Sequence, residues 1–305
     1  MESEIASSSE RETAPLPPGC AEGYLTRNGV RLHYVAAGSG PLILLLHGYP
    51  EFWYSYRYQL PALAQSHRVV ALDMRGYNLS DKPPDGYDIA TLCEDLRGAI
   101  EALGETKADV VGHDWGGVLA WALAIRAPEY VRRLVILNAP HPATFQRTLY
   151  SPSQWLRSAY VGFFQLEGIA EDALARDNYA LIWRTFRAAD RERAWLTDAD
   201  IQRYVDAIAR PGALTAALSY YRQVVRRGPG IVGPARVITA PTLALWGELD
   251  PYLGIESLDG LERWVDDLRV QRFSRAGHWL NQQEPARVNE ALLEFLSRTA
   301  RGNVL

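Results

Sequence analysis

The amino-acid sequence predicts an α/β protein with a mostly parallel, doubly wound sheet and one inserted helical segment. Near-continuous apolar runs that end at turn residues, such as "PLILLLHG" (41–48) and "HRVVALDMRG" (67–76), are typical of strands buried on both faces. Helical stripes alternate with these runs, which implies right-handed crossovers between parallel strands. From about Thr144 to Val232 the alternation stops, and this stretch predicts short helices without a convincing strand.

The elements are expected in the following order. Residues 1–20 are acidic and polar and predict a disordered leader. Asn28-Gly29 lies between two alternating segments (24–38) and predicts a β-hairpin. Residues 87–104 place apolar side chains on one helical stripe and end at Gly104. The other expected elements are helices at 51–64, 117–128 and 285–297 and strands at 108–112, 133–140, 241–250 and 268–278.

These patterns divide the chain into an expected core, residues 21–143 and 233–305, and an expected helical lid, residues 144–232. A helical insertion between strands of an open sheet would lie at the carboxyl ends of the strands. Ligands bind at that edge of such sheets. The lid is therefore inferred from its position and not from a motif.

Composition narrows the class of protein. The chain has 305 residues, 48% of them hydrophobic and 22% charged, with a net charge of −4. This balance gives no reason to expect nucleic acid or an anionic membrane as a partner. No apolar run reaches the length of a membrane span, and the leader has no apolar signal segment. Two cysteines, Cys20 and Cys93, do not suggest a disulfide framework. We expect a cytoplasmic globular protein, a monomer or a homodimer.

The stretch "GHDWGG" (112–117) carries the first chemical signal. Gly112 and Gly116 flank Asp114 at −2 and +2, as a sharp turn from strand to helix requires where the two backbones come close. Such a turn strains its central residue, lifts the Asp114 side chain above the sheet and aims the Trp115 N–H at the same space. A helix N-cap aspartate is the plain alternative.

Three further stretches are predicted to follow strands at the same edge of the sheet as Asp114. "HGYP" (47–50) ends an early strand, and the N–H of Tyr49 would be a second oxyanion donor beside that of Trp115. Asp250 and His278 each follow a predicted strand. Their order after Asp114, nucleophile then acid then histidine, is the order that accompanies this turn.

The other histidines are expected to have supporting roles. His33 and His67 are predicted to be structural, His47 and His141 to bind the backbone at strand ends, and His113 to point away from Asp114. No histidine pair has metal-ligand spacing, and no dinucleotide-binding fingerprint is present.

With these residues assembled, the chain from about Gly23 to Ser297 resembles an α/β-hydrolase of the epoxide hydrolase and haloalkane dehalogenase group. It is most similar to the soluble epoxide hydrolases. The motifs that carry the resemblance are "HGYPEFWYSYRYQ", "DMRGYNLSDKP", "GHDWGG", "NAPHPATFQR", "SYYR", "WGELDPYL" and "AGHW".

The resemblance implies an aspartate nucleophile, Asp114, and two lid tyrosines that hold the epoxide oxygen. Tyr221 precedes the arginine of "SYYR", and Tyr160 lies in "SAYVGFFQ". The tyrosines with which these two could be confused are Tyr220, Tyr150 and Tyr179. The resemblance also implies that Trp115, Phe145 and Pro50 line the substrate site.

A carboxylate at this turn can do what a serine cannot. Asp114 can displace an alkoxide or a halide without a base and leave an alkyl ester, which has a carbonyl that water can attack. His278, oriented by Asp250, would activate that water, and the Tyr49 and Trp115 N–H groups would hold the oxyanion. The expected reaction converts an apolar or aromatic epoxide and water to a vicinal diol, without a metal or an organic cofactor.

Other reactions use the same nucleophile. A haloalkane dehalogenase needs N–H donors for a halide; Trp115 is present, but Tyr49 stands where such enzymes often have asparagine, so Trp155 or Trp183 would have to contribute. A fluoroacetate dehalogenase would have arginine at the positions of Trp115 and Val118.

Two further alternatives concern the triad. In some relatives the acid follows an earlier strand, near Asn138 here, and because Asn138 is not an acid the role falls to Asp250. A noncatalytic ligand-binding protein would be expected to have lost a triad member, and none is missing here.

Overall fold

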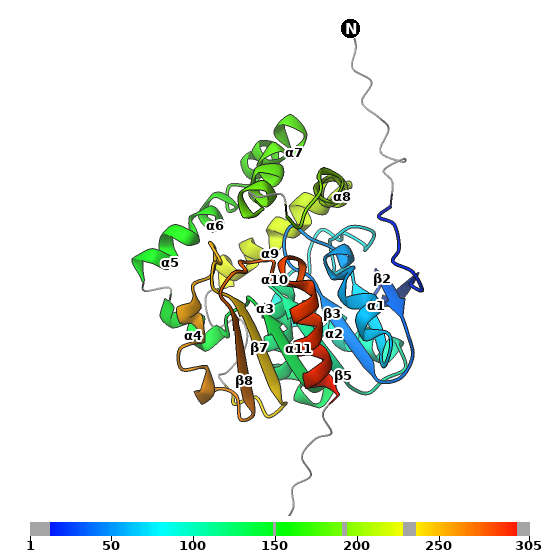
Figure 1. Cartoon of the computed structure of the whole chain (residues 1–305). Helices are drawn as coiled ribbons and strands as arrows, with labels where there is room; N and C mark the ends of the chain where they lie inside the picture. Colours follow the sequence, from blue (N-terminus) through cyan, green and yellow to red (C-terminus); the bar gives the residue numbers. More distant parts are fainter. Residues whose placement is uncertain (1–12, 149–150, 191–193, 228–235, 298–305) are drawn as a thin grey trace, which may run out of the picture.

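A computed structural model describes residues 13–148, 151–190, 194–227 and 236–297. Most of the predicted leader, and Tyr150, lie outside these ranges. The described chain forms an eight-stranded sheet in the order β1-β2-β4-β3-β5-β6-β7-β8, in which β1, β2 and β4 pair antiparallel and all other neighbours are parallel (Figure 1). The strands are β1 (Ala21–Arg27), β2 (Val30–Ala37), β3 (Leu42–Leu46), β4 (Arg68–Leu72), β5 (Ala108–His113), β6 (Val131–Leu137), β7 (Thr242–Gly247) and β8 (Leu268–Phe273). The predicted α/β class with a mostly parallel sheet is confirmed.

Burial along the strands follows the sequence pattern. All residues of β3, β5 and β7 are buried, as expected for strands that are covered on both faces. The edge strand β1 is mostly exposed. Arg27 pairs with Val30 across the predicted hairpin turn, where Asn28 and Gly29 have φ angles of 51° and 75°. Both turn residues are left-handed, which is the reason that this turn favours Asn-Gly.

Helices cover both faces of the sheet. The helix α1 (Gln59–Leu63) packs against α11 (Pro285–Leu296) on the face seen in front in Figure 1, and α2 (Ile89–Ala102) packs against α3 (Trp115–Arg126). The shorter elements around the core are α10 (Leu280–Gln283) and the 3-10 turns at Trp53–Tyr56, Pro128–Tyr130, Ile255–Leu258 and Leu261–Arg263.

The prediction of one helix over residues 51–64 is wrong. The structure has a 3-10 turn at Trp53–Tyr56 and a separate helix α1 that begins at Gln59. Pro61 explains the break, because a proline has no N–H to donate and its ring would clash with the carbonyl of Arg57 in a continuous helix. Proline is tolerated within the first turn of a helix, and Pro61 is the third residue of α1.

The described segment between β6 and β7 is mostly helical, with turns between its helices and one isolated β-bridge from Ile238 to Val265. Its helices are α4 (Pro142–Thr148), α5 (Pro152–Arg157), α6 (Ala159–Phe163), α7 (Ile169–Ala189), α8 (Asp198–Ile208) and α9 (Ala213–Arg227). Figure 1 shows α5 to α8 gathered beyond one end of the sheet. We call α4 to α9 the lid. The limits of the lid as an independent unit, 144–232, stay a prediction, since residues 228–235 lie outside the described chain.

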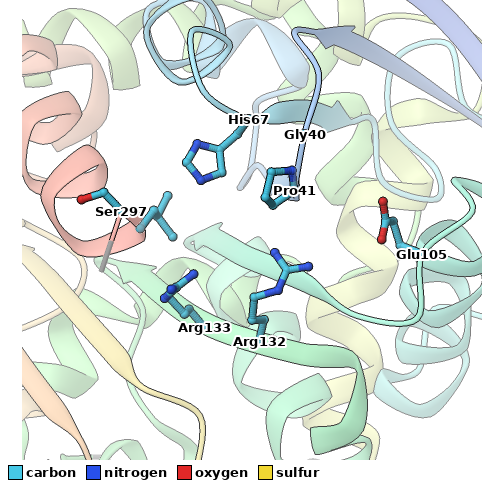
Figure 2. A pocket seen from close by; sticks show the side chains of 8 residues that line it. Gly40, Pro41, His67, Glu105, Arg132, Arg133 and Ser297 are labelled. Carbon is cyan, nitrogen blue, oxygen red and sulfur yellow. The ribbon is translucent and has the colours of Figure 1, made fainter. Parts of the chain in front are cut away.

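A surface hollow of about 560 Å³ opens at the amino ends of the parallel strands (Figure 2). His67, Arg132 and Arg133 line it together with the residues just before β3, and both arginines contact the buried Asp109. This edge lies opposite the carboxyl ends of the strands, where the turn after β5 places Asp114. The hollow is therefore separate from the candidate site described below. Across the described residues, no helix is long and apolar enough to cross a membrane.

Candidate active site

The turn after β5 leaves one residue, Asp114, between strand and helix. Its backbone angles, φ 50° and ψ −119°, are strained for a residue other than glycine. A Cβ atom on Gly116 would lie 2.1 Å from the carbonyl oxygen of Leu46, and one on Gly112 would lie 2.3 Å from that of Gly116. The flanking glycines are thus required by backbone contact, and the turn has the sharp form that the sequence predicts.

The backbone after β3 holds the Asp114 carboxylate. The N–H of Tyr49 donates to Asp114 Oδ1 at 2.9 Å. His47 fixes this segment, because its Nδ1 lies 2.8 Å from the Gly48 oxygen and its Nε2 accepts the N–H of Met74. Trp115 is the first residue of α3, so its N–H has no acceptor within the helix. The Tyr49 N–H therefore binds the Asp114 carboxylate, and the Trp115 N–H, on the next residue along the chain, has no acceptor within its helix.

His278 lies between the buried carboxylate of Asp250 and the partly buried carboxylate of Asp114. Its Nδ1 is 2.8 Å from Asp250 Oδ2, and its Nε2 is 3.6 Å from Asp114 Oδ2. Burial alone would lower the pKa of His278, but the charges of Asp250 and Asp114 outweigh burial and raise the pKa to about 10. Burial would raise the pKa values of Asp114 and Asp250, yet the contact with His278 lowers both. These shifts favour two ionised carboxylates and a protonated imidazole in the resting site.

Asn138 binds the carboxylate of Asp250. It directly follows β6, in a left-handed conformation (φ 42°), and its Nδ2 donates to Asp250 Oδ2 at 2.7 Å. The N–H groups of Tyr252 and Leu253 donate to Asp250 Oδ1 at 2.7 and 2.9 Å. Sequence reasoning excluded Asn138 as the acid and missed its contact with Asp250, although an asparagine at the end of a buried strand was a signal.

A second buried pair lies beneath His278. His113 places Nδ1 2.8 Å from Glu51 Oε2 and Nε2 2.8 Å from the backbone oxygen of His278, so both ring nitrogens bind groups other than Asp114. Glu51 also accepts the N–H of Gly48 and a side-chain N–H of Gln282. This network ties the turn after β3 to the backbone of the histidine. Sequence reasoning missed Glu51, whose signal was a lone acid within an aromatic motif.

Aromatic side chains of the lid cover Asp114. The Tyr221 ring, on α9, is 4.9 Å from the Trp115 ring and 5.9 Å from the Tyr160 ring of α6. Burial, and after it the negative charge of Asp114 among other neighbours, raises the pKa of the Tyr160 and Tyr221 phenols, so both stay protonated. We call Tyr49, Trp115, Tyr160, Phe164 and Tyr221 the aromatic cluster.

Other predicted residues lie differently. Tyr220 donates its hydroxyl to the Arg75 backbone oxygen at 2.7 Å, which distinguishes it from Tyr221. Phe145 lies on α4, and within the described ranges no ring contact joins it to the aromatic cluster; Phe164 takes part instead. Pro50 is buried beside Tyr49. Trp155 is 70% exposed on α5.

One neighbour of the site was missed altogether. The Tyr252 ring lies 5.2 Å from the His278 ring and 5.9 Å from that of Tyr160, and so bridges the core and the lid. Among the described residues, no group of three or more His, Cys, Asp or Glu side chains is placed to hold a metal ion.

Comparison with known proteins agrees with this architecture. Residues 41–285 match the family described as alpha/beta hydrolase fold. The chain is 42% identical to AB hydrolase superfamily protein YfhM of Bacillus subtilis, over 90% of this chain and 96% of that protein. It is 38% identical to Epoxide hydrolase 4 of Homo sapiens, over 90% of this chain and 78% of that protein.

Solved structures give the same picture. The epoxide hydrolase of Bacillus megaterium in complex with an inhibitor superposes with a TM-score of 0.85 at 36% identity, covering 90% of this chain and all of that one. Epoxide Hydrolase A of Mycobacterium thermoresistibile superposes with a TM-score of 0.80 at 31% identity, covering 91% of this chain and 98% of that one.

The pKa of His278 gives a first test of this geometry. Asp114→Asn keeps the shape of the side chain and removes its negative charge, so the imidazolium loses one of its two counterions. We expect the pKa of His278 to fall below that of the unchanged protein in an NMR titration of the imidazole nitrogens. His67, at the opposite edge of the sheet, is the internal control. An unchanged His278 pKa would contradict the contact with Asp114.

The turn itself is tested by adding one methyl group. Gly116→Ala places a Cβ atom against the Leu46 backbone, and we expect the free energy of unfolding in urea to fall by at least about 1–3 kcal/mol. Gly162→Ala in α6 is the matched control, because nothing lies within 4 Å of its Cβ position. It should be neutral or stabilising by about 0.5–1 kcal/mol. Equal effects of the two changes would contradict the close approach.

Proposed function

The chain belongs to the α/β-hydrolase family and, within it, to the epoxide hydrolases, and we propose that it converts an apolar or aromatic epoxide and water to a vicinal diol through an alkyl ester on Asp114. One observation carries the proposal. An ionised carboxylate stands at the strained turn, with one oxygen on the Tyr49 N–H and the other facing His278, beneath two protonated lid phenols.

In the first step Asp114 attacks an oxirane carbon. A bond forms from a carboxylate oxygen to that carbon, and the bond between the carbon and the epoxide oxygen breaks. The leaving alkoxide needs a proton or strong hydrogen bonds, which Tyr160 and Tyr221 would supply from the lid, on the side opposite Asp114. The lid is therefore proposed to supply the proton donors of the site, and the core is proposed to supply the nucleophile.

The proton on His278 balances the charges of this step. When the carboxylate becomes a neutral ester, the imidazolium loses one of the two charges that raise its pKa. The alkoxide needs one proton at the same moment, and the imidazolium holds one that it can then release, directly or through the phenols. The products of the step are a hydroxy ester and a neutral His278, which is the form that can act as a base.

In the second step His278 takes a proton from water, and the hydroxide attacks the ester carbonyl. The oxyanion would be held by the N–H groups of Tyr49 and Trp115. Collapse breaks the bond between the Asp114 carbonyl and the substrate oxygen, releases the diol and restores the ionised carboxylate beside a protonated His278. Asp250, which four donors hold, stays ionised throughout and orients the imidazole.

The dehalogenase alternative has weaker support. A halide needs N–H donors, and Trp115 is in place, but Trp155 is 70% exposed, which leaves the partly buried Trp183 as the other candidate for a second donor. Two protonated phenols suit an alkoxide, which needs a proton, better than a halide, which does not. No member of the Asp114, Asp250 and His278 set is missing, so a noncatalytic role has no support from the site. The expected cytoplasmic location and the monomeric or homodimeric state stay predictions.

Trapping the ester tests the proposed function. In His278→Gln, the protonated Tyr160 and Tyr221 phenols still supply a proton to the alkoxide, so the attack by Asp114 continues, while water is not activated. After incubation with styrene oxide, mass spectrometry should find one added substrate on the peptide that contains Asp114. Asp114→Asn combined with His278→Gln should show no adduct. The unchanged enzyme should form the diol and release no halide from a bromoalkane; halide release without diol formation would favour the dehalogenase.

The two phenols are tested by removing their hydroxyls. Tyr160→Phe and Tyr221→Phe should each slow alkylation in pre-steady-state kinetics, while hydrolysis of the ester continues. The double change should lower the rate of alkylation by about 10²–10⁴-fold. Because the two donors share one oxygen, the effects of the single changes should not add. Tyr220→Phe is the control, since its hydroxyl already binds Arg75, and should leave alkylation unchanged. Unchanged alkylation in both single variants would overturn this role.

A further inference from the structure

The two lid phenols come from helices that are held in different ways. Eight residues of α9, which carries Tyr221, are buried, and the neighbouring Tyr220 donates its hydroxyl to the Arg75 backbone oxygen of the core. No residue of the short helix α6, which carries Tyr160, is fully buried. Packing therefore holds Tyr221 in place, whereas the position of Tyr160 depends on the contacts at the ends of α6.

The side chain of Arg222 binds the end of α6. Arg222 directly follows Tyr221 on α9 and is 5% exposed. Its Nε donates to the backbone oxygen of Phe164, the residue that caps the carboxyl end of α6, at 2.9 Å. The last carbonyls of a helix have no partner within it, so this bond pairs one of them. A single side chain thus joins the helix of Tyr160 to the helix of Tyr221.

The carboxylate of Glu171 holds the guanidinium in this orientation. Arg222 Nη1 and Nη2 donate to Glu171 Oε1 and Oε2 at 2.7 and 2.9 Å. Glu171 lies in the first turn of α7 and also accepts the N–H of Gly168 at 2.9 Å. Two parallel bonds to one carboxylate fix the plane of a guanidinium, which directs Nε toward Phe164. A lysine has no such fork and could not bind both groups in this way.

Phe164 connects Arg222 to Tyr160. Its N–H donates to the Tyr160 backbone oxygen at 3.0 Å, and its ring lies 5.3 Å from the Tyr160 ring and 5.0 Å from the Tyr221 ring. A catalytic group that is misplaced by about 1 Å can lower a rate by about 10²-fold. Movement of α6 relative to α9 would carry the Tyr160 hydroxyl away from the oxygen that it is proposed to share with Tyr221.

We propose that Arg222 is a positioning residue, which holds the Tyr160 hydroxyl against the epoxide oxygen by binding the carboxyl end of α6. This inference rests on the epoxide hydrolase function proposed above, since it concerns one of the two phenols of that reaction. Arg222 acts through α6 and not on the substrate. Its effect is therefore expected in alkylation, which uses the phenols, and not in hydrolysis of the ester, which uses His278.

Arg222→Lys tests this role, because it keeps the positive charge and removes the fork. In pre-steady-state kinetics with styrene oxide, it should slow alkylation by as much as Tyr160→Phe does and no more, up to roughly 10²-fold. Hydrolysis of the ester should continue at the unchanged rate. Thermal unfolding shows whether the variant is folded. If it is not, Glu171→Gln takes its place, since it weakens the fork and leaves the bond from Nε to Phe164; it should slow alkylation less.

Two backgrounds distinguish positioning from a general loss of structure. In Tyr160→Phe, the added Arg222→Lys should leave the rate of alkylation unchanged, because the hydroxyl that it positions is already absent. In Tyr221→Phe, the added Arg222→Lys should slow alkylation further, because Tyr160 is then the remaining phenol donor. A merely structural role of Arg222 would slow alkylation in both backgrounds.

Arg226→Gln is the matched control. Arg226 lies one turn further along α9 and pairs with Glu167, just after α6, but both side chains are exposed, so this ion pair contributes little. The change should leave alkylation unchanged. The inference is overturned if folded Arg222→Lys alkylates at the unchanged rate, if it slows alkylation equally in both backgrounds, or if Arg226→Gln has the same effect. If Tyr160→Phe itself does not slow alkylation, the proposed reaction falls, and the inference falls with it.

Discussion

The close approach of α3 to the carboxyl end of β3 is the constraint on which the site depends. The N–H of Gly116 donates to the His47 oxygen at 2.9 Å, and no Cβ atom fits at residue 116. This contact presses the start of α3 against the turn after β3, so the Tyr49 N–H reaches a carboxylate 65 residues away in sequence. Backbone contacts, and not side-chain packing, therefore set the position of Asp114, and the strain at that residue is the local consequence of leaving only one residue between strand and helix.

The two carboxylates beside His278 differ in how completely they are hydrogen-bonded. Asp250 accepts four bonds, from the N–H groups of Tyr252 and Leu253, from Asn138 and from His278. Asp114 accepts one short bond, from Tyr49, and meets His278 only at 3.6 Å. A saturated carboxylate stays ionised but has no lone pair to offer, whereas Asp114 keeps lone pairs that the proposed attack would use. This difference in donors supports the proposed roles of Asp250 as the orienting acid and Asp114 as the nucleophile.

Local sequence patterns predicted the strands, the hairpin at Asn28-Gly29 and the sharp turn at Asp114, because each depends on neighbouring residues. The helix expected at 51–64 failed for an equally local reason, since the position of Pro61 outweighed the apolar pattern. The contact of Asn138 with Asp250 spans 112 residues, and that of Glu51 with His113 spans 62. Such contacts arise when the sheet order places β6 beside β7 and β3 beside β5, and no pattern within one segment contains that information.

The charged groups of the site come from the core sheet, and its neutral phenols come from the lid. The groups that must be ionised follow core strands, where backbone N–H groups and Asn138 hold them. The groups that must stay neutral, the Tyr160 and Tyr221 phenols, come from lid helices, where burial, together with the charge of Asp114, raises their pKa values. In the proposed reaction, the negative charge that attacks the substrate would therefore also keep the opposing donors protonated until attack begins. Formation of the proposed ester would remove that charge, and the phenols and the imidazolium would then release a proton more readily, when the alkoxide needs one.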